Sequence, residues 1–391
     1  MKKKNDKMAD KKDNKINIKK TSLHDILHIK IELHWTFILL LLFTLFISIY
    51  SGWYLFIIVV LLFVMVLLHE LAHSVTALEN DIEVKKIILL PLGGASIIDL
   101  DEIKPSTSLK IALAGPIMSI LLGLISGLFA IILPPIMLTE WLGVPVSLSG
   151  IFQILFILNI LLGIFNLLPA FPLDGGRVLK SALEKKHNQF DATKIAVRIS
   201  KIFLILFLIF SVIYTLMMPG MTISYFTFIL IWDLIIVMFI YGGAQSELEV
   251  AYILKYASNL PVKSAITKNF AVIKPSAKLR DLYKILIKNN THLVLFKDSS
   301  SGKARVYLVS SRLPSVLSSN PEILERSIKN YSIEIPYIEY NKSLAKAIEK
   351  MRYENASILA VIKNNKIVGL LNAQHVESIV ALHIPQVKNK K

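Results

Sequence analysis

Six stretches of apolar residues, each close to the length needed to cross a bilayer, most constrain what this chain can fold into. A helix needs about 20 apolar residues to span the roughly 30 Å hydrocarbon core of a membrane. The six stretches occupy 35–50, 53–77, 111–133, 150–170, 202–218 and 223–242. Ser51-Gly52, Pro134-Pro135 and Pro219-Gly220 divide them into three pairs. The sequence therefore predicts an α-helical multi-pass membrane domain of six spans.

Positive charge in the connections predicts the orientation of these spans. The connections 51–52, 134–149 and 219–222 hold no lysine or arginine, whereas 79–110 holds four and 171–201 holds seven. The first twenty residues add nine lysines. Because cytoplasmic loops carry the excess of lysine and arginine, we expect both termini in the cytoplasm and the protein in the cell membrane. No secretory signal precedes the first apolar stretch, so we interpret that stretch as a retained span.

Composition limits the partners and the metal ligands. The chain of 391 residues is 54% hydrophobic and 18% charged, with a formal net charge of +16 and no cysteine. The basic excess lies in the N-terminal tail and at the membrane flanks, which indicates contact with anionic lipid rather than with nucleic acid. Without cysteine, any metal must be held by histidine, carboxylate or water.

The second apolar stretch contains His69-Glu70-Leu71-Ala72-His73. Two histidines four residues apart lie on one face of a helix, where both can bind one metal ion. In zinc peptidases with this pattern the glutamate is not a ligand but takes the proton from the attacking water. Within 33–78 the only histidine or charged side chains are His34 and this trio. Ionisable residues inside a membrane span mark a functional site by default, because they are costly there.

A catalytic tetrahedral site needs a third protein ligand, and the best candidate is Asp174. It lies in the segment 166–177, Asn-Leu-Leu-Pro-Ala-Phe-Pro-Leu-Asp-Gly-Gly-Arg, at the cytoplasmic end of the fourth predicted span. Pro169 and Pro172 are expected to end the helix, and Gly175-Gly176 to permit a turn. The alternative is that Asp174 is the N-cap of a helix that begins near Arg177.

At this point the chain resembles the site-2 protease family (M50) of intramembrane metalloproteases. The residues that carry the resemblance are His69-Glu-Leu-Ala-His73, Asn166, Pro169, Pro172-Leu-Asp174-Gly-Gly, Gly93-Gly94-Ala95, Ala114-Gly115-Pro116 and His34-Trp35. The resemblance implies one zinc ion per subunit bound by His69, His73 and Asp174, with Glu70 as general base. It also suggests that Asn166 supports the substrate strand or the oxyanion. The alternative for Asn166 is an interhelical hydrogen bond.

Two other features of the membrane region have open interpretations. The segment Val84–Asp99 is apolar but too short to span, which predicts two short strands around Gly93-Gly94, as the resemblance also implies; a plain re-entrant loop is the alternative. An exposed strand edge beside the site could pair with an unwound substrate. Asp233, in the sixth stretch, is either a gating residue or an acid near the outer interface.

The C-terminal part repeats itself at an offset of 65 residues. The matching positions are Leu279, Leu282, Tyr283 and Leu286 with Leu344, Ala347, Ile348 and Met351. The predicted order of strand, helix, strand, strand resembles a pair of cystathionine-β-synthase (CBS) domains. Such pairs bind adenine nucleotides, and Asn372 and His375 stand at the corresponding positions, while the first repeat departs further at Val306–Arg312. A nucleotide site and a dimerisation module are both compatible with this tail.

The predicted fold class is thus a six-span helical membrane domain with a small β-element, followed by a soluble α/β CBS pair. The expected domains are a basic tail (1–30), the metalloprotease domain (31–245), a linker (246–257), the tandem repeats (258–385) and a second basic tail (386–391). The predicted function is zinc-dependent cleavage of single-span membrane proteins in or near their transmembrane segments, that is, regulated intramembrane proteolysis. The rival hypothesis is a CBS-regulated transporter or metal-handling protein that uses the same ligands; a catalytically inactive scaffold is the third.

Overall fold

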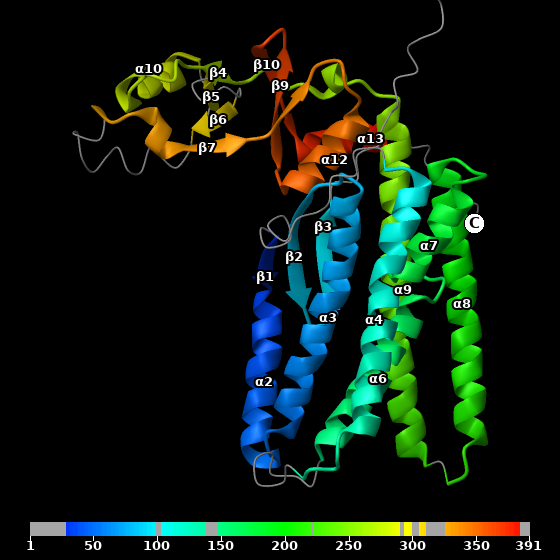
Figure 1. Cartoon of the computed structure of the whole chain (residues 1–391). Helices are drawn as coiled ribbons and strands as arrows, with labels where there is room; N and C mark the ends of the chain where they lie inside the picture. The colour runs from blue at the N-terminus through cyan, green and yellow to red at the C-terminus, as the bar shows by residue number, and fades with distance from the viewer. Residues whose placement is uncertain are drawn as a thin grey trace, which may run out of the picture. The chain divides into compact units, whose positions relative to one another are not determined.

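The computed structural model of the chain describes residues 29–91, 93–98, 103–137, 147–220, 222–289, 293–298, 305–309 and 325–383 (Figure 1). The predicted basic tails lie outside these ranges, apart from residues 29 and 30. The chain forms two compact units. One comprises Met1–Ile98 and Leu121–Asn159, and the other comprises Asp99–Ile120 and Ile160–Lys391.

The first unit begins with a helical hairpin and a small sheet. Its elements are β1 (Lys30–Leu33), α2 (Trp35–Ser51), α3 (Tyr54–Glu79), β2 (Val84–Leu90) and β3 (Gly93–Ile98). Gly52 follows α2 with a φ of 89°, a conformation that glycine adopts without steric cost, and so lets α3 return along α2. The break predicted at Ser51-Gly52 between the first two apolar stretches is confirmed.

The sheet has the order β1-β2-β3, with β1 parallel and β3 antiparallel to β2. The two strands predicted around Gly93-Gly94 are confirmed, and the re-entrant loop is wrong. Strand β1 was not predicted, because its alternation of polar and apolar residues covers only four positions beside the first apolar stretch. Glu32 pairs with Lys30 at 2.8 Å and with Lys86 of β2 at 2.6 Å. These two ammonium groups lower the pKa of Glu32 to about 2.

Among the described residues, five helices are long and apolar enough to cross a membrane. They are α3, α4 (Pro105–Ile132), α6 (Leu148–Asn166), α8 (Gln189–Met217) and α9 (Ile223–Ser258). At most 28% of the most apolar window of each is buried inside the protein, so wide apolar surfaces face outward, as expected in lipid. The remaining predicted span, the first stretch at 35–50, corresponds to α2 (Trp35–Ser51), a shorter apolar helix. The membrane character of the domain is confirmed, and the count of six spans stays a prediction.

In the second unit, α8 and α9 form an antiparallel pair (Figure 1). Asp233 of α9 is buried and accepts a hydrogen bond from the Ser211 hydroxyl of α8 at 2.5 Å. This contact gives the acid a partner on a neighbouring helix, as expected for a polar group within a span. A gating role for Asp233 stays a prediction.

Helix α9 continues beyond the apolar stretch that begins it. At 36 residues it is about 54 Å long, well over the roughly 30 Å of a bilayer core. The segment 246–257, expected as a linker, is the C-terminal part of this helix. Ala257 is buried in the hydrophobic core of the second repeat, so the connection to the soluble tail is helical and packed.

The soluble tail consists of two repeats with the predicted order of elements. The first holds β4 (Ala271–Val272), α10 (Leu279–Asn289), β5 (Val294–Asp298) and β6 (Arg305–Val309); the second holds β8 (Tyr337–Glu339), α12 (Leu344–Glu354), β9 (Ile358–Lys363) and β10 (Lys366–Asn372), followed by α13 (Ala373–His383). In each repeat the first strand is parallel and the third antiparallel to the middle strand. The predicted fold class, a helical membrane region followed by a repeated α/β tail, is confirmed.

The sheet of each repeat gains an extended segment from elsewhere in the tail. This segment directly precedes the other repeat in the sequence. Strand β7 (Ser332–Ile335), which precedes the second repeat, pairs with β6 of the first. Thr267, which precedes the first repeat, exchanges two backbone hydrogen bonds with Leu370 of β10 at 2.9 and 3.1 Å. Thr267 and Ser332 are separated by the same 65 residues that separate the repeats. The exchange is therefore symmetric and joins the two repeats.

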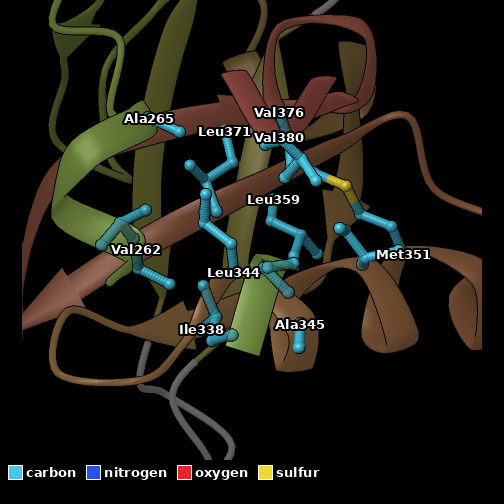
Figure 2. Packing of buried hydrophobic residues seen from close by; sticks show 14 residues of the cluster. Val262, Ala265, Ile338, Leu344, Ala345, Met351, Leu359, Leu371, Val376 and Val380 are labelled. Carbon is cyan, nitrogen blue, oxygen red and sulfur yellow. The ribbon is translucent and has the colours of Figure 1, made fainter. Parts of the chain in front are cut away.

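The core of the second repeat is closely packed (Figure 2). Leu344 and Met351 of α12 lie against Leu359 of β9 and Leu371 of β10, and Val376 of α13 closes the cluster. Leu359 is fully buried. Burial of such side chains supplies most of the stability of a domain of this size.

Leu359→Ala is expected to destabilise the second repeat by about 2–5 kcal/mol, because it removes buried methyl groups and leaves a cavity. Hydrogen–deuterium exchange on the full-length protein should show faster exchange in β9 and β10. Leu382→Ala is the matched control, since Leu382 is 83% exposed. Equal exchange in the two variants would contradict this account of the core.

Candidate metal centre

His69 and His73 are brought together on one face of α3. Their Nε2 atoms lie 3.2 Å apart, and the two side chains are buried, with exposures of 4% and 6%. Two nitrogen ligands at about 2.05 Å from a tetrahedral zinc ion would lie about 3.3 Å apart. The two imidazoles are thus spaced as two ligands of one zinc ion.

Glu70 completes this cluster. One ligand atom from each of His69, Glu70 and His73 lies within 4.8 Å of the others, and Glu70 is 9% exposed. A carboxylate at this distance can contact a water molecule that occupies the next coordination position. The predicted base and two of the predicted metal ligands are therefore found together in one buried site.

Strand β3 lies directly against Glu70. The Ser96 hydroxyl donates a hydrogen bond to Oε2 of Glu70 at 2.8 Å. A Cβ atom on Gly94 would lie 2.2 Å from Cγ of Glu70, so a larger residue at this position would displace the Glu70 side chain. The sequence singled out Gly93-Gly94-Ala95 but not Ser96, because nothing in a short apolar strand shows which residue faces the helix.

Asp174, the predicted third ligand, is the first residue of α7 (Asp174–Leu183). The N-cap position is Leu173, so the alternative that Asp174 caps a later helix is wrong. A carboxylate in the first turn is favoured by the positive end of the helix dipole. Asp174 belongs to the second unit and the histidines to the first, and its role as a ligand stays a prediction.

Residues 167–173 form a bend between α6 and α7, and this bend contacts both α8 and α9. The Phe171 N–H donates to the Ser200 hydroxyl of α8 at 3.1 Å, and Phe171 is almost fully buried. A Cβ atom on Gly243 of α9 would lie 2.6 Å from Cδ of Pro172, so α9 approaches the bend as closely as a glycine allows. The backbone that leads to Asp174 is therefore fixed by packing.

Gly175 and Gly176 lie within α7, so the expectation that they permit a turn is wrong. Glycine is required there for a different reason. A Cβ atom on Gly175 would lie 2.2 Å from the Leu168 carbonyl oxygen, and one on Gly176 would lie 2.7 Å from the Phe171 nitrogen. The helix thus packs directly on the backbone of the bend.

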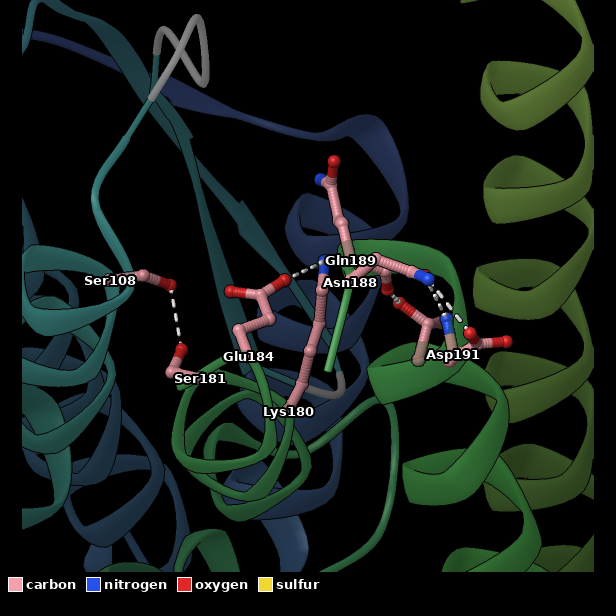
Figure 3. Close-up of polar contacts among 8 residues, drawn as sticks. Ser108, Lys180, Ser181, Glu184, Asn188, Gln189 and Asp191 are labelled. Carbon is pink, nitrogen blue, oxygen red and sulfur yellow. Dashed lines mark hydrogen bonds and ion pairs between the residues drawn. The ribbon is translucent and has the colours of Figure 1, made fainter. Parts of the chain in front are cut away.

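Polar contacts anchor the far end of α7 (Figure 3). The Ser181 hydroxyl donates to Ser108 of α4 at 2.9 Å, and Lys180 lies 3.8 Å from Glu184. Burial raises the pKa of Glu184, and the neighbouring Lys180 opposes that shift. Asn188 caps α8 by accepting a hydrogen bond from the Asp191 N–H at 2.9 Å. The hydrogen bond between Ser181 and Ser108 therefore joins α7, the helix that carries Asp174, to α4.

Asn166 is the last residue of α6 and is partly buried. Its predicted role in substrate or oxyanion support, and the alternative of an interhelical hydrogen bond, stay predictions. The sequence analysis did not identify Asn159, which lies about two helical turns before Asn166 on α6. Asn159 is fully buried and donates to the Leu155 carbonyl at 2.8 Å, while its Oδ1 has no hydrogen-bond partner in the described part of the chain.

Asn372 and His375, the two candidate nucleotide-site residues, border the same cavity. Asn372 and His375 border a space of about 340 Å³ together with Thr267, Leu293, Ile358, Leu370, Leu371 and Gln374. Oδ1 of Asn372 also accepts a hydrogen bond from the Gln374 N–H at 2.9 Å, at the start of α13. The structure thus brings together the predicted pair, and nucleotide binding there stays a prediction.

Known proteins with similar sequences decide the family. The model of peptidase family M50 matches residues 57–209, which include the histidine cluster and Asp174. Zinc metalloprotease MJ0392 of Methanocaldococcus jannaschii is 33% identical over 270 residues, which are 68% of this chain and 72% of that protein. The chain belongs to peptidase family M50. The predicted family, the metalloprotease class and zinc as the metal are thereby confirmed.

Other similar proteins span different parts of this M50 peptidase. A putative zinc metalloprotease of Synechocystis, sll0528, is 28% identical over 80% of this chain and 79% of its own length. The solved site-2 protease of M. jannaschii is 33% identical, covers 56% of this chain and 90% of its own, and has a TM-score of 0.41. The CBS domain of a bacterial CNNM/CorC family Mg²⁺ transporter, solved with ATP, is 15% identical over 35% of this chain and 97% of its own, with a TM-score of 0.28.

Gly175→Ala is expected to lower the stability of the protein by at least about 1–3 kcal/mol, because the added Cβ meets backbone atoms that cannot move aside. Thermal unfolding of the full-length protein in detergent should show a lower midpoint. Gly242→Ala is the control, since a Cβ atom on this helical glycine meets nothing within 4 Å. The same midpoint for both variants would show that α7 does not pack on the bend as described.

Proposed function

We propose that this M50 peptidase is a zinc-dependent intramembrane endopeptidase that cuts single-span membrane proteins in or near their transmembrane segments. The observation that carries the proposal is the buried trio of His69, Glu70 and His73 on α3, a helix of mean hydropathy 2.8 over its most apolar window. A metal site on a membrane-spanning helix would be accessible to substrates that are themselves embedded in lipid.

The residues of this cluster fit zinc and its usual chemistry. His69 and His73 would hold the ion, with Asp174 proposed as the third ligand of one ion per subunit. Zinc bound there would supply Lewis-acid activation of a water nucleophile near neutral pH. Glu70 accepts a proton from that water and then delivers it to the departing amine nitrogen of the substrate. Asn166 is proposed to support the substrate strand or the oxyanion.

The substrate must be extended before it is cut, because the carbonyl groups of a helix are shielded by their own hydrogen bonds. Strand β3 is at the edge of the described sheet, next to Glu70. Edge strands can pair with an added strand, so β3 is proposed to hold the unwound substrate. Preferred substrates would then contain helix-breaking residues near the cleaved bond.

The proposed location is the cell membrane, with both termini in the cytoplasm. Lysine and arginine cluster in 79–110 and 171–201 and are lacking from the opposite connections. If α3 enters from the outer side near Trp53, His69 lies about 24 Å along the axis, about 6 Å from the cytoplasmic boundary, and His73 lies about one turn nearer to that boundary. Water is therefore expected to reach the metal from the cytoplasm.

The soluble tail is proposed to regulate this activity. Its cavity of about 340 Å³, bordered by Asn372 and His375, is the proposed site for an adenine nucleotide. A dimer through the CBS pair is the other role that we consider. Either arrangement would couple proteolysis to a cytoplasmic signal, as regulated intramembrane proteolysis requires.

Glu70→Gln is expected to keep zinc and to reduce cleavage of a co-reconstituted single-span protein by about 10²- to 10⁴-fold, the usual contribution of a general base. Cleavage in proteoliposomes and zinc content by atomic absorption provide the two measurements. Glu79→Gln, at the exposed end of the same helix, is the control. Unchanged cleavage by Glu70→Gln would rule out the proposed chemistry, and metal flux that survives this change would support the rival transporter.

Asp174→Ala is expected to weaken zinc binding by more than the roughly 10- to 100-fold that loss of an outer-shell partner costs. Competition with a chelator of known affinity gives the dissociation constant. Asp191→Ala, which removes an exposed carboxylate from the first turn of α8, is the matched control. Wild-type zinc affinity in Asp174→Ala would exclude this residue as a ligand.

A further inference from the structure

Strand β3 contacts the side chain of Glu70 at two points. The Ser96 hydroxyl donates to Oε2 at 2.8 Å, and the backbone at Gly94 leaves no space for a Cβ atom beside Cγ. Residues two apart on a strand face the same side, so Gly94 and Ser96 both face α3. One contact restricts the aliphatic part of Glu70, and the other restricts its carboxylate.

The position of Ser96 is itself well defined. Ser96 is paired with Ile87 on β2, the central strand of the sheet, and Ile87 is fully buried. On its other side, Ser96 lies 3.2 Å from the hydroxyl of Ser74, which also lies 3.0 Å from the Glu70 carbonyl oxygen. Ser96 therefore has a fixed backbone, and its hydroxyl lies between Ser74 and Glu70.

A glutamate side chain has three rotatable bonds, so burial alone does not set the direction of its carboxylate. A hydrogen bond to one carboxylate oxygen selects an orientation and leaves the second oxygen available for another contact. Outer-shell contacts of this kind orient the reacting groups of metal sites. Ser96 supplies such a contact from an element other than the helix that carries Glu70.

We propose that Ser96 is a positioning residue for Glu70. Its hydroxyl holds the carboxylate in the orientation needed to accept a proton, and it links that orientation to β3. This inference rests on the proposed function, because it assigns a role within the same reaction. If the substrate pairs with the free edge of β3, one strand then sets the position of both the substrate and the base.

The test compares Ser96→Ala with Ser96→Thr in proteoliposomes that contain a single-span substrate. Ser96→Ala is expected to lower kcat by about 10- to 100-fold, with KM and zinc content unchanged. Ser96→Thr, which keeps a hydroxyl, is expected to restore most of the loss. Ser126→Ala is the matched control, because the Ser126 hydroxyl donates to the Leu122 carbonyl within α4.

Three results would overturn the positioning role: wild-type kcat in Ser96→Ala, loss of zinc in that variant, or no rescue by threonine. A second measurement does not depend on activity. The carboxylate stretching bands of Glu70, identified by infrared difference against Glu70→Gln, are expected to shift in Ser96→Ala but not in Ser126→Ala, and unshifted bands would also overturn the proposal. If the wild-type protein cleaves nothing, the proposed function fails by itself, and the infrared bands still decide whether Ser96 holds Glu70.

Discussion

Polar groups placed among apolar helices must find partners within the protein, because hydrocarbon offers them none. Several side chains of the membrane region follow this constraint, whereas Oδ1 of Asn159 lacks a partner among the described residues. Ser48 donates to the Thr44 carbonyl of its own helix, Ser211 donates to Asp233 across two helices, and Ser96 donates to Glu70 from a strand. Within the trio on α3, Glu70 gains such a partner from another element. The small sheet is the clearest example, since β3 supplies both a hydroxyl and a close backbone approach.

Much of the fold could be predicted because lipid imposes simple rules on sequence. The length of the apolar stretches predicted the helices, the i, i+4 histidines predicted the metal cluster, and the 65-residue offset predicted the repeats. Strand β1 was missed, since Lys30–Leu33 alternates polar and apolar residues over only four positions and pairs with residues more than fifty positions later. Ser96 was missed because a contact between a strand and a helix depends on how the two pack, which spacing does not reveal.

The glycines after Asp174 show how a correct feature can be interpreted incorrectly. The residues themselves are unmistakable in the sequence, and flexibility is the most familiar reason for a glycine pair. In the structure they are helical and buried, and their small size is what matters, because backbone atoms of the bend occupy the space of a side chain. Gly243 of α9 is likewise needed for its small size, because the ring of Pro172 occupies the space of a side chain there. Local sequence does not distinguish these two uses of glycine.

The symmetric exchange between the tail repeats also bears on their origin. Neither sheet is complete without a segment that precedes the other repeat: β7 borders β6, and Thr267 borders β10. A lone ancestral copy would have left an open sheet edge, which is a hazard for aggregation. Such an ancestor would have needed to form a domain-swapped dimer, in which each copy supplies the missing segment to the other. Duplication within one gene would then have turned an association between chains into a permanent feature of a single chain.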